Sequence, residues 1–166
     1  MIRYASTRKL LQKLDKLYRE HSTSDLSLPI AYSKLANLEV CGWLEEAFDE
    51  VAHNCVRNKL KSLEDRRLLI KKIEATHGFD YATHTRPLLI FALGVVKLIE
   101  VEKKLASDGS LDRLNGAIGS LKPVRRDAAH TSIAGTTESY PAPSVAIQRF
   151  ETCLPIVQNL WRLVRA

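Results

Sequence analysis

Apolar residues recur at helical spacing along most of the chain. The pattern is clearest in the final segment, where they fall three or four positions apart on one face: Ile147, Phe150, Leu154, Val157, Trp161 and Val164. Ser144 is a candidate cap for this helix, and Pro155 is expected to kink it because proline lacks a backbone donor. Comparable apolar faces earlier in the chain predict an all-α protein.

Turn-forming residues divide the first half of the chain into helices. A polar stretch at 21–29 separates the first helix from a long second one over about 30–59. The run SLED at 62–65 is a capping box, and it opens a third, basic helix that ends near Thr76. Residues 77–87 show no period and are predicted to form a loop.

The second half divides in the same way. A fourth helix is expected over about 87–106, followed by a break at 107–110 and a shorter fifth helix over 111–121. Pro123 then separates that helix from the segment VRRDAAH at 124–130. The overall prediction is a bundle of five or six helices.

Length and cysteine content bound the class of protein. With 166 residues, the chain is expected to form a single domain over 1–166 that buries a core without disulfides. Its three cysteines, Cys41, Cys55 and Cys153, form no CxxC pair and indicate reduced thiols in a cytoplasmic protein. The most hydrophobic run, 88–96, is far shorter than the roughly 20 residues of a membrane span, so no membrane association is expected.

The net charge of +6 is compatible with a polyanionic partner such as RNA, although basic proteins often bind no nucleic acid. The chain has no Gly-rich phosphate loop, no HExxH zinc motif and no GxSxG nucleophile motif. His77 and His84 flank Asp80, but their spacing matches no common metal site and favours surface residues. No metal and no cofactor are therefore expected.

One short segment combines residue types suited to RNA cleavage. Arg125 offers a planar set of donors that matches phosphate oxygens, and His130 can exchange protons near neutral pH. RNA supplies its own nucleophile, the 2′-hydroxyl, so this chemistry needs no metal. A surface arginine pair beside a loop histidine is the alternative interpretation.

This segment resembles the signature of the HEPN superfamily, in which an Arg is followed after four to six residues by a His. The match lies at Arg125, Ala129 and His130, and the departure lies at Arg126, where the family usually has Asn, Asp or another small polar residue. Shifting the frame to Arg126–Asp127 restores the polar neighbour but leaves only three intervening residues, so Arg125 is the preferred motif arginine. The segment at 38–51 is similar to the early helix of HEPN proteins, which often carries an acidic residue facing the site.

The resemblance implies a HEPN-like fold and a metal-independent endoribonuclease, most similar to bacterial toxin and defence effectors. It implies a homodimer with facing motifs, and an antitoxin or other regulatory protein as a further partner. Arg125, His130 and Glu45 are the expected catalytic residues, with Glu45 orienting His130. Arg126 and Asp127 are the expected RNA contacts.

Geometry leaves two arrangements open. On a regular helix, side chains five positions apart diverge by roughly 140°, so either a helix begins within the motif or two copies build a composite site. Basic helices around 9–19 and 57–72 could carry an RNA backbone, and Tyr81 or Tyr140 could stack a base. Two other functions remain open. One is a non-catalytic HEPN-like module that binds RNA, a nucleotide or a partner, and the other is a helical adaptor.

Overall fold

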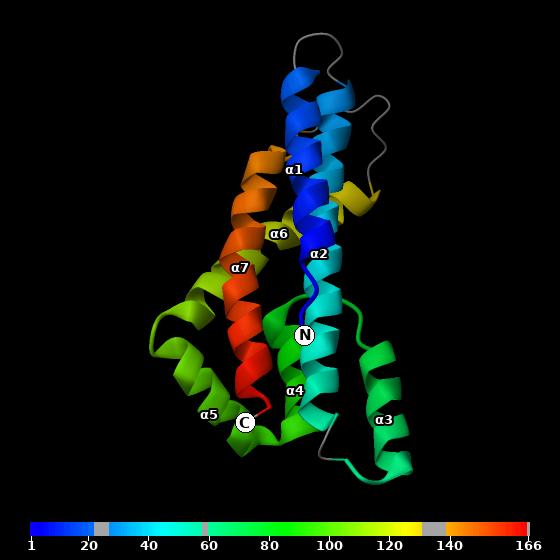
Figure 1. Ribbon diagram of the computed structural model, residues 1–166, viewed down its shortest axis with the longest axis vertical. Helices are drawn as coiled ribbons and strands as arrows, with labels where there is room; N and C mark the ends of the chain where they lie inside the picture. Colours follow the sequence, from blue (N-terminus) through cyan, green and yellow to red (C-terminus); the bar gives the residue numbers. More distant parts are fainter. Residues whose placement is uncertain (22–26, 58–59, 131–138, 166) are drawn as a thin grey trace.

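The computed structural model describes residues 1–21, 27–57, 60–130 and 139–165 (Figure 1). These residues form helices without any strand, which confirms the all-α class. The elements are α1 (Ala5–Glu20), α2 (Ser27–Val56), α3 (Leu63–Glu74), the π-helical turn η1 (Tyr81–Thr85), α4 (Arg86–Leu93), α5 (Val95–Ala106), α6 (Ser110–His130) and α7 (Pro143–Leu163). The described part of the chain thus holds seven α-helices, not the expected five or six.

Helix α2 is the centre of the fold. It packs against α1 and α7 along its length and also contacts α3, α4 and α6 (Figure 1). Its apolar residues, together with residues of every other α-helix, form one hydrophobic core. Phe150 of α7 is fully buried there and meets the Trp43 ring edge-on, with the centroids 4.6 Å apart. The three cysteines are buried and free, as expected.

The single helix expected over 87–106 is interrupted at Gly94. This residue has φ +81°, a conformation that side-chain-bearing residues rarely adopt, and its N–H still donates to Ile90 O at 2.8 Å to close α4. The chain turns there, so that Leu98 and Leu105 of α5 reach the core. The apolar spacing in the sequence continues across Gly94, so it does not reveal the break. Only the positive φ of this glycine marks where α4 ends.

The expectation that Pro123 ends a helix is wrong, because α6 runs through it to His130. Proline leaves the carbonyl of Gly119, one turn earlier, without its N–H partner. Both Pro123 and Gly119 are exposed, so water can bond to that carbonyl. Burial of Leu121 and Ala128 on another side holds the helix together on either side of the proline.

Two predicted helix starts have different outcomes. Ser62 caps α3, with its Oγ accepting the N–H of Asp65 at 3.3 Å, as the capping box predicts. Ser144 does not cap α7, whose N-cap is Ala142 without a side-chain bond. Pro143 occupies the first turn instead, where its fixed φ suits a helix and its missing donor costs nothing.

Candidate functional site

The last turns of α6 present one basic face, formed by Lys122, Arg125, Arg126, Ala129 and His130. At about 100° per residue, Arg125 and His130 lie at its two edges and the other three lie between them. The motif therefore lies on the last described turns of a helix that begins well before Arg125. Of the two arrangements left open by the sequence, the one in which a helix begins within the motif is wrong. A 140° spread still lets both side chains border a single hollow beside the helix.

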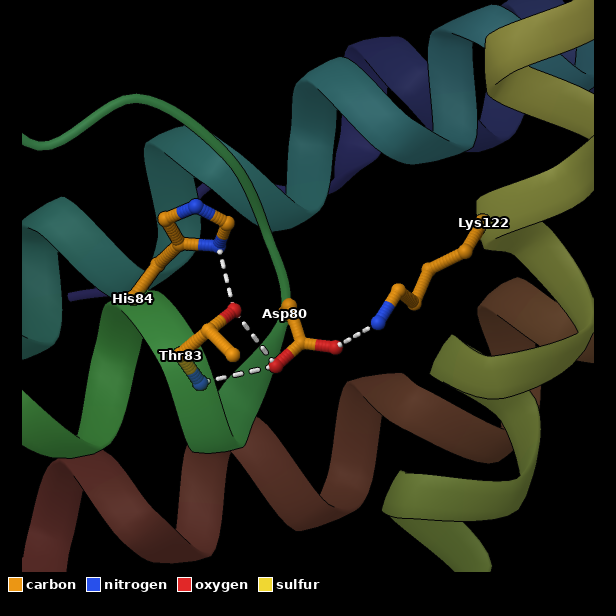
Figure 2. A network of polar contacts seen from close by, with 4 residues as sticks. All are labelled: Asp80, Thr83, His84 and Lys122. Carbon is orange, nitrogen blue, oxygen red and sulfur yellow. Dashed lines mark hydrogen bonds and ion pairs between the residues drawn. The ribbon is translucent and has the colours of Figure 1, made fainter.

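The segment before α4 lies opposite this face. Asp80 caps η1, because its Oδ1 accepts the N–H of Thr83 at 2.8 Å and the Thr83 hydroxyl at 2.9 Å. Lys122 Nζ lies 2.5 Å from the other carboxylate oxygen and ties this segment to α6 (Figure 2). The loop predicted over 77–87 is thus wrong from Tyr81 onward, because the Asp80 cap starts helical structure there.

A pocket of about 230 Å³ separates the two segments. Its lining residues are Gly78, Phe79, Asp80, His84, Lys122, Arg125, Arg126, Ala129 and His130, and we call it the basic pocket. Three permanent cations and two imidazoles face one carboxylate, Asp80, which is already paired with Lys122. The net charge of the pocket favours an anion such as a phosphodiester.

Arg125 is held from two sides. Its Nη2 lies 2.8 Å from Glu45 Oε1 of α2, and its guanidinium carbon lies 5.9 Å from the centre of the Phe79 ring. Glu45 Oε1 is buried and accepts no hydrogen bond among the described residues, so its contact with Arg125 is an ion pair without a well-aligned N–H. Glu45 therefore contacts Arg125, whereas the sequence analysis expected it to orient His130. The remaining guanidinium donors stay available to a phosphate.

The two expected RNA contacts differ in position. Arg126 lines the basic pocket with its side chain 72% exposed, and its Nε lies 3.0 Å from Oδ1 of Asp127. Asp127 does not line the pocket. Tyr81 cannot stack a base, because it is buried and its hydroxyl donates to Glu102 at 3.1 Å. Tyr140 is half-buried.

His84 is a pocket residue that the sequence analysis did not assign to the site. The spacing of His77 and His84 favours a pair of surface residues over metal ligands, and of the two only His84 lines the pocket. The available signal was Asp80 three positions before Thr83, a spacing typical of a capped turn, with the imidazole of His84 directly after it. Its relation to α6, about 40 residues further along, could not be seen in the local pattern.

Neither a thiol nor a bound metal is indicated by the described residues. Burial raises the pKa of the Cys41 thiol to about 12, so the thiol stays protonated near neutral pH. Burial likewise raises the pKa of Cys153 to about 12. No group of three or more His, Cys, Asp or Glu residues in the described part of the chain could hold a metal ion.

Asp80 has a shifted pKa. Burial of its carboxyl opposes ionisation, but the bonds from Lys122 and Thr83 outweigh that effect and lower the pKa from 3.8 to about 2. The carboxylate is therefore charged throughout the neutral range and accepts hydrogen bonds without donating any.

Asp80→Asn should lower the free energy of unfolding by about 1 kcal/mol at pH 7, because it removes the charge that pairs with Lys122. The folded-state pKa is depressed, so this stabilisation is complete above about pH 4 and is lost as the pH falls toward 2. Urea denaturation at several pH values measures the difference. Asp112→Asn, at an exposed carboxylate of α6, is the control. A difference that persisted unchanged at pH 2 would contradict this assignment.

A second pocket, of about 420 Å³, carries more carboxylates than cations in its lining. It lies beside the N-terminus and is lined in part by Glu46, Asp49, Glu50 and His53 of α2. Burial raises the pKa of Asp49 to about 6, and neighbouring carboxylates add to this shift. The three carboxylates of this second pocket outnumber the two cations in its lining, Arg3 and the Met1 ammonium group, whereas three cations and one carboxylate line the basic pocket. The smaller basic pocket is therefore the better candidate for an RNA site.

Comparison of the chain with family models, curated proteins and solved structures found no significant match. The resemblance to HEPN proteins therefore depends on the motif and helical pattern of this chain itself. None of the helices in the described ranges is both long and apolar enough to cross a membrane.

Proposed function

We propose that this protein is a metal-independent endoribonuclease of the HEPN type that cleaves RNA in the basic pocket. One observation carries the proposal: Arg125, Arg126 and His130, chosen from the sequence, line the same pocket as Lys122. A phosphodiester needs positive charge on its non-bridging oxygens and a group that moves protons at its 2′ and 5′ oxygens. The pocket offers both.

Arg125 is the residue best placed to stabilise the charged phosphorane. Glu45 and Phe79 limit the positions that its guanidinium can take, so little rotamer entropy remains to be lost when phosphate binds. Glu45 is thus a positioning residue. Arg126, largely exposed at the rim, is proposed to contact a neighbouring phosphate.

The wider setting follows from the family resemblance. We propose a HEPN-like cytoplasmic toxin or defence effector that forms homodimers and is restrained by an antitoxin or another regulatory protein. The dimer is not needed to bring Arg125 and His130 together, since one chain places both in the basic pocket. A second copy would extend the RNA-binding surface.

The proposal is tested with end-labelled RNA and purified protein in excess EDTA. Cleavage should give a 2′,3′-cyclic phosphate and a 5′-hydroxyl, and a single 2′-deoxy nucleotide at the cut site should block it. His130→Ala should cleave about a hundredfold more slowly, because a positioned acid–base group contributes about that much. His77→Ala replaces an exposed histidine outside the pocket and should leave the rate unchanged.

Three outcomes would change this conclusion. Binding of RNA without cleavage by the wild type would favour the non-catalytic HEPN-like module. If the wild type neither binds nor cleaves RNA, the ribonuclease and the RNA-binding module are both excluded, and the helical adaptor remains. Equal rates for the His130 and His77 variants would place the chemistry outside the basic pocket.

A further inference from the structure

His84 is held in position by its neighbours. Its Nδ1 lies 3.1 Å from the Thr83 hydroxyl, and the ring edge bearing Nε2 points away from Thr83 (Figure 2). Gly78, with φ +120°, lies against the ring so closely that a Cβ there would come within 2.9 Å of His84 Cε1. The ring is half-buried and lines the basic pocket.

The hydrogen bonds determine which ring nitrogen carries the proton. Asp80 is ionised and can only accept, so the single proton of the Thr83 hydroxyl goes to its carboxylate. The hydroxyl oxygen must then accept from His84, which requires a proton on Nδ1. The neutral imidazole therefore keeps its lone pair on Nε2. This is the tautomer that a general base needs.

We propose that His84 is the general base of the basic pocket and that it works with His130, the general acid, within one chain. This inference rests on the proposed ribonuclease function. His130 is the other imidazole that lines the basic pocket, and this position makes it the candidate for the acid role. The pocket would then hold a proton acceptor, a proton donor and the cations that bind the phosphate.

The proposed step balances protons and bonds. His84 Nε2 takes the proton of the 2′-hydroxyl, and the 2′-oxygen forms a bond to phosphorus. The bond from phosphorus to the 5′-oxygen breaks, and His130 gives its proton to that leaving oxygen. The products are a 2′,3′-cyclic phosphate and a 5′-hydroxyl. The two imidazoles end in exchanged protonation states and return through proton exchange with water.

The test compares variants on RNA and measures the pH dependence of cleavage. His84→Ala should cut about a hundredfold more slowly than wild type, with His77→Ala as the matched control. The wild-type rate should follow a bell-shaped curve, and His84→Ala should lose the fall on the acidic side, where the base becomes protonated. Thr83→Val removes the support of the ring and should slow cleavage, whereas Thr83→Ser retains the hydroxyl and should restore it.

An RNA with sulfur in place of the bridging 5′-oxygen separates the two roles, because a thiolate leaves without being protonated. This substrate should rescue His130→Ala and should not rescue His84→Ala. Circular dichroism and thermal denaturation check that each variant folds. Wild-type protein that fails to cleave RNA overturns the proposed function and this inference with it. Wild-type cleavage with an equally active His84→Ala variant overturns the His84 assignment alone.

Discussion

Arg125→Ala is expected to slow RNA cleavage by about two to three orders of magnitude, the effect of removing one preorganised donor from a charged transition state. The guanidinium is held between Glu45 and Phe79, so its charge is positioned before substrate binds. Arg125→Lys keeps the charge but loses the planar set of donors, so its cleavage rate should lie between those of the wild type and Arg125→Ala. Single-turnover cleavage of labelled RNA measures all three rates.

Two controls separate chemistry from folding. Arg126→Ala removes an exposed arginine from the same face and should lower the rate less than tenfold. The double variant Glu45→Ala/Arg125→Ala also removes the half-buried carboxylate left unpaired by the single change, so it should recover stability but not activity. A larger loss of cleavage rate from Arg126→Ala than from Arg125→Ala would mean that Arg126 is the motif arginine, as in the shifted frame.

Phe150→Ala is expected to lower the free energy of unfolding by about 3–5 kcal/mol, the range for a large aromatic side chain removed from a packed core. Phe150 is fully buried and packs edge-on against Trp43, so its loss leaves a cavity between α7 and α2. In a chain of this length the midpoint of thermal denaturation should fall on the order of 10 °C. Urea denaturation gives the free energy directly.

Phe91→Ala is the matched control for this substitution. The Phe91 side chain is 47% exposed on α4, so the same change should cost less than about 1 kcal/mol. Equal losses at the two positions would mean that α7 does not pack as described.

Much of the helical structure was predictable from the sequence, because the signals that produce it are local. The apolar spacing in the last segment puts Phe150, Leu154 and Val157 on the buried face of α7. Ser62 caps α3 through a bond to a residue only three positions away. Among the missed boundaries, the continuation of α6 through Pro123 depends on whether the unpaired carbonyl is exposed to water. Exposure is a property of the folded chain.

The candidate site was predictable only in part. The sequence pointed to Arg125, Arg126 and His130, which are neighbours on one helix, and the structure places all three around the basic pocket. It did not point to Lys122 or His84 as members of the same site. Nor did it show that Glu45 pairs with Arg125.

The sequence by itself determined the helical class, most helix positions and the residue types available for chemistry, because these depend on neighbours a few positions apart. Tertiary structure alone decided that α6 continues through Pro123, that Glu45 meets Arg125 and that Asp80 meets Lys122. The last two contacts join residues 80 and 42 positions apart, and they depend on the shared core, which fixes where α2, η1 and α6 lie.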